Sequence, residues 1–373
     1  MEAETHSPGF WGWFRDRWLV VAAVGTVVAL ATALLTATIF APKGNPAIRA
    51  PGFELLDQQG RPTSLSQFRG KVVVLTFIDP YCTQICPLTT QSMLQALRLL
   101  GPAAAANVQL LGINANPDKT RISDVAFYTR AHDMDGRWRF LTGTRAQLEE
   151  VWRGYHVYVA AVGNHIDHEA VVYLIGRRGR ERAVYSTPMS YGDVGEQAQM
   201  LAKAIARLLP SRPAVLREAS LEQNSPLVPA ETATLPALGA GHSGVVLGKA
   251  HAHLLCFFAS WLGETTNLPA QLAGLDAYGV RARRNGWPAP VAVDELATET
   301  SAAAARKLFE GMAATLDTPI VEDASGRLAD GYQVEELPWY VLTSRSGKIL
   351  WRHDGWLSPA KLIAGVRGAL AAR

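Results

Sequence analysis

The sequence predicts an α/β protein that contains two mixed sheets flanked by helices, one after the other along the chain. Continuous apolar runs such as Val72–Ile78 alternate with helix-like segments such as Pro87–Leu100, which is typical of buried parallel strands joined by helices. Each half then closes with a hairpin pattern and a helix. A length of 373 residues also suits two domains.

The elements of the first half are expected in a fixed order. After Phe53–Leu56 and Val72–Ile78, the chain alternates between strand and helix patterns before its closing hairpin and helix. Strands are expected at Val108–Ile113, Val171–Ile175 and Ala183–Tyr185, and helices at Ile122–His132, Arg145–Gly154 and Val194–Leu209.

The second half repeats this order. Strands are expected at Leu254–Ala259, Pro290–Val293, Trp339–Thr343 and Lys348–Arg352, and helices at Thr300–Met312 and Pro359–Leu370. Val74–Cys82 aligns with Leu254–Leu262 at an offset of 180 positions, and Val171–Arg180 aligns with Trp339–Lys348 at an offset of 168. The chain therefore divides into domains at residues 50–209 and 230–373, joined by a polar, proline-containing linker at 210–229.

An uncharged apolar segment precedes both domains. Residues 18–40 would cross a bilayer core of about 30 Å at about 1.5 Å per residue, and they are too long for the apolar run of a cleaved signal peptide. We therefore expect a transmembrane helix after a cytoplasmic tail of residues 1–17. The positive charges flanking it are balanced, so the orientation follows from the short tail: both domains are expected on the external (periplasmic or extracellular) face of the cytoplasmic membrane.

Charge and cysteine content exclude some classes of function. The net charge is only +3 and the basic residues form no block, which argues against nucleic acid as a partner. Three cysteines are too few for a disulfide scaffold. Cys256 lies in an apolar strand pattern and is expected to be a buried, inert thiol.

Cys82 and Cys86 carry the chemistry. They follow a buried strand and precede a helix, and at a spacing of four they are expected to share one helical face with Cβ atoms about 5–6 Å apart. That is wide for a disulfide but suits two thiolates on one ion. A helix N-terminus favours the thiolate. Two thiolates and an imidazole suit Cu(I), but a redox pair or a structural disulfide is also open.

The third ligand is sought among the histidines. His168 stands just before the strand Val171–Ile175, and we choose it over His165 and His156, which remain as alternatives. Asp167 either orients an imidazole or is a plain turn residue, and Asp79 either serves the thiols or only shapes the loop.

The first half resembles the Sco/SenC/PrrC family of membrane-anchored, thioredoxin-like copper proteins that help build the copper centres of cytochrome c oxidase. The resemblance rests on Ala50–Phe77, the Cys-x-x-x-Cys-Pro of Cys82–Pro87, Phe140–Thr144 and the Asp-His that ends at His168. It covers about Ala50 to Leu209.

The resemblance implies a fold of two thioredoxin-like domains and a copper site. That family's ligands, two cysteines and one histidine, fall on Cys82, Cys86 and His168. In thioredoxin-like folds, the residue before the corresponding strand faces the cysteine loop, which is why His168 is preferred. Two departures concern partner recognition and affinity: Asn114–Pro117 lacks an aspartate usual in the family, and Thr83–Ile85 lacks the common proline and aspartate.

The second half resembles the thioredoxin-like domains of membrane-tethered thiol oxidoreductases. Phe257–Trp261 matches the approach to their active site, but Leu262–Thr265 stands where they have Cys-x-x-Cys, and Leu337-Pro338 occupies the position of their cis-proline. Without those cysteines the domain cannot exchange disulfides. Trp261 and Trp339 are expected to pack its core.

The favoured function is delivery of copper, as Cu(I) or Cu(II), to the copper-bearing subunit of cytochrome c oxidase or another copper acceptor. Whether the protein is an enzyme stays open, because a thiol–disulfide reductase that prepares the acceptor's cysteines would need the thiols but not His168. A third possibility is an interaction module that docks a partner through the second domain.

Overall fold

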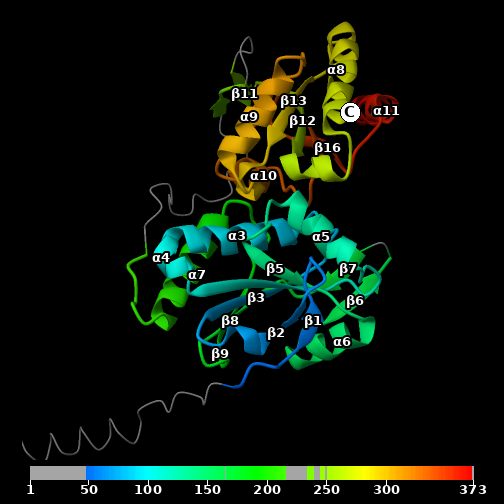
Figure 1. Cartoon of the computed structure of the whole chain (residues 1–373). Coiled ribbons are helices and arrows are strands. Elements are labelled where there is room, and N and C mark those ends of the chain that lie inside the picture. The colour runs from blue at the N-terminus through cyan, green and yellow to red at the C-terminus, as the bar shows by residue number, and fades with distance from the viewer. Residues whose placement is uncertain (1–47, 164, 216–232, 239–243, 248–249, 372–373) are drawn as a thin grey trace, which may run out of the picture. The chain divides into compact units, whose positions relative to one another are not determined.

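Strand β3 (Val72–Ile78) is the central strand of the first sheet and is buried along its whole length. Its side chains alternate between two apolar clusters: Val72, Val74 and Ile78 pack on one face of the sheet, and Leu75 and Phe77 pack on the other. The computed structural model describes residues 48–163, 165–215, 233–238, 244–247 and 250–371 (Figure 1). Burial on both faces explains the continuous apolar pattern of this strand.

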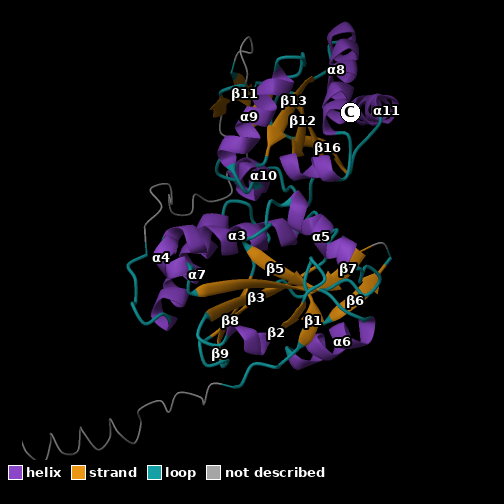
Figure 2. Cartoon of the chain, viewed as in Figure 1, coloured by secondary structure: helices purple, strands orange, loops and turns teal. Residues whose placement is uncertain are grey.

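The first sheet has the strand order β5-β4-β3-β8-β9. Strands β3, β4 and β5 are parallel, whereas β8 is antiparallel to β3 and β9 is antiparallel to β8. Helices α3, α5 and α7 contribute to the cluster on one face, and α6 contributes to the cluster on the other (Figure 2). The elements of this half are β1 Glu54–Leu56, β2 Pro62–Ser64, a 3-10 turn Leu65–Phe68, β3 Val72–Ile78, α3 Ile85–Leu100, α4 Pro102–Ala105, β4 Val108–Asn114, α5 Ile122–Ala131, β5 Trp138–Leu141, α6 Arg145–Gly154, β6 Val159–Val162, β7 His165–His168, β8 Val171–Ile175, β9 Glu181–Ser186 and α7 Val194–Leu208.

The second sheet repeats this arrangement with the order β14-β13-β12-β15-β16. Strands β12, β13 and β14 are parallel, and β15 and β16 add in antiparallel fashion. The elements of this half are β10 Ala233–Leu235, β11 Val245–Leu247, β12 His253–Phe258, a 3-10 turn Ser260–Glu264, α8 Leu268–Asn285, β13 Ala289–Asp294, a 3-10 turn Leu296–Thr298, α9 Ala302–Ala313, β14 Ile320–Glu322, α10 Arg327–Gly331, β15 Trp339–Thr343, β16 Ile349–Asp354 and α11 Pro359–Ala371.

The strand register reproduces the offsets found in the sequence. Val74 pairs with Leu174 in the first sheet, and Leu254 pairs with Leu342 in the second. These two pairs differ by 180 positions on the central strand and by 168 on its antiparallel neighbour. An α/β fold with mixed, thioredoxin-like sheets is therefore confirmed. The pattern missed the short strand β5 and the hairpin of β6 and β7, because strands of four residues give almost no periodicity.

The predicted anchor at residues 18–40, its tail at 1–17 and most of the linker at 210–229 lie outside the described residues. Among the helices that the structure describes, none combines the length and apolar character needed to span a bilayer.

The two sheets belong to one compact unit that begins at Arg49. Leu88, Tyr191 and Val194 precede the linker in sequence, yet their side chains lie in the apolar core of the second half. Asp330 of α10 accepts hydrogen bonds from the Ser190 hydroxyl and from the backbone N–H groups of Tyr191 and Gly192, at 2.8–3.0 Å. A shared apolar core holds the halves together more firmly than a polar contact alone would.

His132 lies at the junction of the halves. Its ring packs against that of Tyr128 in a tilted arrangement with centroids 4.1 Å apart, and its centroid lies 4.8 Å from that of Trp261 in the second half. The His132 carbonyl accepts a hydrogen bond from the Thr300 hydroxyl. The buried Nδ1 atom has no hydrogen-bond partner. Burial lowers the pKa of His132 to about 3, so the ring is neutral at pH 7.

Leu88→Ala is expected to destabilise the whole unit by about 2–5 kcal/mol, because it opens a cavity where the first half enters the core of the second. Urea unfolding followed by tryptophan fluorescence measures this loss and should show a single transition. The same truncation at half-buried Leu97, on the same helix, is the control and should cost less. Separate transitions for the two halves would contradict the shared core.

His132→Phe is expected to flatten the dependence of stability on pH. The unfolded state takes up a proton near pH 6.5, but the folded state does not do so until about pH 3, so stability falls as the pH drops below 6.5. Between pH 7 and pH 5 this amounts to about 2 kcal/mol. Unfolding free energies at both pH values, in parent and variant, test the prediction; an equal drop in both would refute it.

Candidate metal centre

The cysteine loop begins where β3 ends, and Asp79 fixes its first turn. The Asp79 carboxylate accepts hydrogen bonds from the backbone N–H of Tyr81 at 3.1 Å and from the side-chain amide of Asn116 at 2.8 Å. Its carbonyl accepts the N–H of Cys82 at 3.1 Å. Asn116 follows β4, the neighbouring parallel strand, so two strand ends cooperate to hold the loop. Asp79 therefore shapes the loop, and its charge also acts on both thiols and on His168.

The expectation that both cysteines share one helical face is wrong. Helix α3 begins at Ile85, so Cys86 lies in its first turn while Cys82 lies in the preceding loop. The cause is the bond from Cys82 to the Asp79 carbonyl, which closes a turn before the helix begins. Pro87 is tolerated because the first N–H groups of a helix have no partner within it.

The two thiols are free and hydrogen-bonded to each other, but they differ in environment. Cys86 is buried, and burial raises its pKa well above the usual value. Cys82 is partly exposed, and the hydrogen bond from the Cys86 thiol lowers its pKa. The pair thus contains one thiol that ionises readily and one that holds its proton.

His168 faces this pair. Its Nε2 atom lies 3.9 Å from the Cys86 sulfur, and its Nδ1 atom lies 3.1 Å from the carbonyl oxygen of Glu169. A carbonyl can only accept, so Nδ1 carries the proton and the Nε2 lone pair is directed to the sulfur. Burial lowers the pKa of His168 and keeps the ring neutral at pH 7, which is the form that binds metal.

The alternative histidines do not share this position. Side chains alternate along β7, with Ile166 and His168 half-buried on one face and His165 and Asp167 exposed on the other. His156 is exposed after α6. The imidazole of His168 is oriented by the Glu169 carbonyl, so that partner is a backbone group rather than Asp167.

The geometry fits a small thiolate–imidazole site in part. Donors in a trigonal site with bonds of about 2.3 Å to sulfur and 2.0 Å to nitrogen lie about 3.7 Å apart, close to the distance between Cys86 and His168. Within the described ranges, however, no group of three or more His, Cys, Asp or Glu side chains is already arranged to hold an ion. Binding therefore requires a small rearrangement of the side chains around the ion.

The second half has no thiol at the equivalent place. Leu262 stands where the first half has Cys82. The turn Ser260–Glu264 replaces the cysteine loop of residues 79–86, which we call the metal loop. Cys256 is fully buried in β12, and burial raises its pKa to about 12. The Leu337–Pro338 peptide bond is cis, as the resemblance of the second half to thiol oxidoreductases implied.

Buried acids lie behind that turn, and sequence reasoning missed them. Glu299 accepts hydrogen bonds from the N–H and the hydroxyl of Ser260, and burial raises the pKa of Glu299 and of its neighbours Asp294 and Glu295. In the sequence these three acidic residues belong to no recognisable motif, so only the fold shows that they lie together behind the turn.

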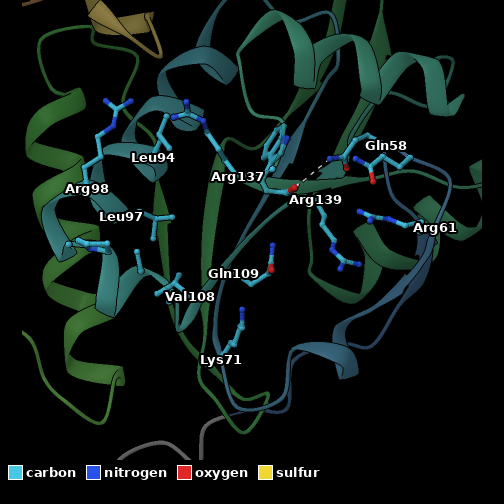
Figure 3. Close-up of a pocket in the computed structure, with 17 residues that line it drawn as sticks. Gln58, Arg61, Lys71, Leu94, Leu97, Arg98, Val108, Gln109, Arg137 and Arg139 are labelled. Carbon is cyan, nitrogen blue, oxygen red and sulfur yellow. Dashed lines mark hydrogen bonds between the residues drawn. The ribbon is translucent and has the colours of Figure 1, made fainter.

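A separate hollow of 840 Å³ opens at the other end of β3 (Figure 3). Of the 17 described residues that line it, none is acidic and five are cationic: Arg61, Lys71, Arg98, Arg137 and Arg139. Lys71 directly precedes β3, whereas Cys82 follows it. A strand of seven residues spans about 23 Å, so this hollow is not part of the cysteine site.

The fold and the site define a thioredoxin-like protein with a dithiol and an adjacent neutral imidazole. Residues 41–206 match the SCO1/SenC family model. Among curated relatives, the mitochondrial SCO2 homologue of Bos taurus is 29% identical over 178 residues, 46% of this chain and 64% of that protein. The mitochondrial SCO1 homologue of Homo sapiens is 24% identical, over 36% of this chain and 46% of its own length. These matches span less than two thirds of the relatives' length.

Solved structures are similar to the same part of the chain. Bradyrhizobium japonicum ScoI with copper bound is 25% identical, with a TM-score of 0.38, and covers 44% of this chain and 100% of its own. The apo Sco1 protein of Thermus thermophilus is 26% identical, with a TM-score of 0.38, and covers 44% of this chain and 94% of its own.

Iodoacetamide is expected to modify Cys82 at least about tenfold faster than Cys86 at pH 7, because Cys82 is more accessible and has the lower pKa. Cys256 should react only after unfolding. Mass spectrometry of the three cysteine peptides over time measures these rates. Equal rates for Cys82 and Cys86 would contradict the asymmetry of the pair.

Proposed function

We propose that this protein binds copper through Cys82, Cys86 and His168 and transfers it to a copper acceptor. The observation that carries the proposal is the 3.9 Å approach of His168 Nε2 to the Cys86 sulfur, with the imidazole neutral and its lone pair directed to the thiol. Two thiolates and one imidazole form a soft donor set that favours Cu(I) over zinc, which normally takes a fourth ligand. Copper here is cargo, as Cu(I) or transiently Cu(II).

The asymmetry of the thiols supports transfer by ligand exchange. Cys82 lies in a partly exposed loop and ionises readily, so it is the donor that a second protein's thiolate can replace first. Cys86 is buried and, together with His168, would hold the ion until the acceptor has supplied its own ligands. The acceptor that fits a SCO1/SenC domain is the copper-bearing subunit of cytochrome c oxidase or another copper protein.

The proposed setting is the external face of the cytoplasmic membrane. Residues 18–40 would anchor the chain in the bilayer after a cytoplasmic tail of residues 1–17. The domain at 50–209 would carry copper, and residues 210–229 would link it to a degenerate thioredoxin-like domain at 230–373. Anchoring would keep donor and acceptor on the same surface.

Thiol–disulfide exchange is the second candidate, and the opposite pKa shifts of the thiols favour it. The Cys82 thiolate would attack an acceptor disulfide and form a mixed disulfide, releasing one acceptor thiolate. The Cys86 thiol would then lose its proton and attack the Cys82 sulfur. The acceptor leaves as a dithiol, and Cys82 and Cys86 are oxidised to a disulfide.

Competitive Cu(I) titration of the reduced protein separates the two functions. Cys82→Ser, Cys86→Ser and His168→Ala are each expected to weaken Cu(I) binding by more than about 100-fold, since even outer partners of metal ligands are worth 10–100-fold. His165→Ala, on the opposite face of β7, is the matched control and should bind as the parent does. Parent-like affinity in His168→Ala, with unchanged rates of disulfide exchange, would favour the reductase.

A further inference from the structure

A loop of the second half contacts the metal loop directly. The backbone N–H of Leu337 donates to the carbonyl of Thr83 at 3.2 Å. The Glu336 carboxylate accepts from the Thr83 hydroxyl at 3.3 Å and from the side-chain amide of Gln84 at 3.4 Å. Thr83 and Gln84 lie between the two cysteines, so three hydrogen bonds from one loop converge on the segment that sets the separation of the thiols.

The contacting loop is itself firmly placed. The Leu337 side chain is 1% exposed and belongs to the apolar core of the second half. Two residues later β15 begins, and Trp339 pairs with Phe257 on the central strand β12. The Leu337 N–H and the Glu336 carboxylate are thus presented by the rigid part of the second sheet rather than by a free loop.

The metal loop has few other supports. Asp79 anchors its first residues and α3 begins at Ile85, but Thr83 and Gln84 lie in neither a strand nor a helix. Apart from their contacts with Glu336, the side chains of these two residues make no hydrogen bond among the described residues. The side chains of Thr83 and Gln84 are therefore restrained by the second half and not by regular secondary structure of the loop itself.

We propose that Glu336, with the backbone N–H of Leu337, is a positioning element that restrains the Cys82–Cys86 loop before copper binds. This role rests on the proposed function. It gives the second half a structural role that needs no cysteine of its own, because its loop forms hydrogen bonds with the metal loop of the first half. Preorganising a loop raises affinity because less conformational entropy is lost on binding. Tyr81 and Gln84 stay exposed, so the contact with Glu336 and Leu337 leaves one side of the metal loop accessible to an acceptor.

The halves do not depend on Glu336 to stay together. Asp330 holds residues 190–192, and Gln91 donates to Thr300 at 3.1 Å. Leu88 lies in the core of the second half. Substitution of Glu336 therefore tests the metal loop without separating the two halves.

The test compares Glu336→Ala, Glu336→Gln and Glu335→Ala in the full chain. Glu335 is the adjacent, exposed residue with the same charge, and glutamine at 336 keeps an oxygen that can accept both hydrogen bonds. In the reduced protein without copper, Glu336→Ala should speed hydrogen exchange at residues 82–84 and alkylation of Cys82 by about 3- to 10-fold, the value of one or two hydrogen bonds. The Cu(I) dissociation constant should rise by a similar factor. Glu336→Gln should stay within about twofold of the parent, and Glu335→Ala should match it.

The outcomes separate this proposal from the proposed function. If Glu336→Ala leaves exchange, alkylation and Cu(I) affinity at the parent's values, the positioning role is overturned even if copper binds at Cys82, Cys86 and His168. If the glutamine variant behaves as the alanine variant does, hydrogen bonding by Glu336 is not the cause and the role is likewise overturned. If hydrogen exchange and Cys82 alkylation change as expected but the parent does not bind Cu(I), the positioning role of Glu336 is retained and the copper function is refuted.

Discussion

The burial of β3 on both faces is the constraint on which the rest of the structure depends. Its side chains are divided between two apolar clusters, so the strand can neither slide nor rotate without exposing one of them. This fixes the point at which Asp79 and the cysteine loop emerge from the sheet. The antiparallel neighbour β8 pairs with β3 in a single register, and His168, the last residue of β7, lies three positions before the first residue of β8.

The site built on this frame works through differences between chemically similar groups. Two thiols four residues apart have opposite pKa shifts, because one is enclosed at the start of α3 and the other remains in the loop and accepts a hydrogen bond. One imidazole presents a lone pair to the sulfur because its other nitrogen is held by a carbonyl. Such a site can bind a soft ion and can also exchange disulfides, and the two activities differ in their need for the histidine.

The second half shows how a fold can be retained when its chemistry is absent. Its sheet has the order and register of the first, but apolar and polar residues stand where the thiols would be. What it keeps is the rigid loop before β15, whose backbone N–H and carboxylate meet the metal loop. A common core that includes Leu88 and Tyr191 makes this contact a fixed feature of the compact unit.

The sequence by itself determined the α/β class, the order of the long strands and helices, the repeat and the cysteine pair, because these depend on periodicity and spacing over many residues. The choice of His168 over His165 rested on a resemblance and not on a pattern, and only the tertiary structure gives it a physical basis, since the two side chains lie on opposite faces of a four-residue strand. The tertiary structure also decided that Cys82 lies outside the helix, because the Asp79 carbonyl captures its N–H. The contact of Glu336 with the loop joins residues about 250 positions apart, and no local signal encodes such a distance.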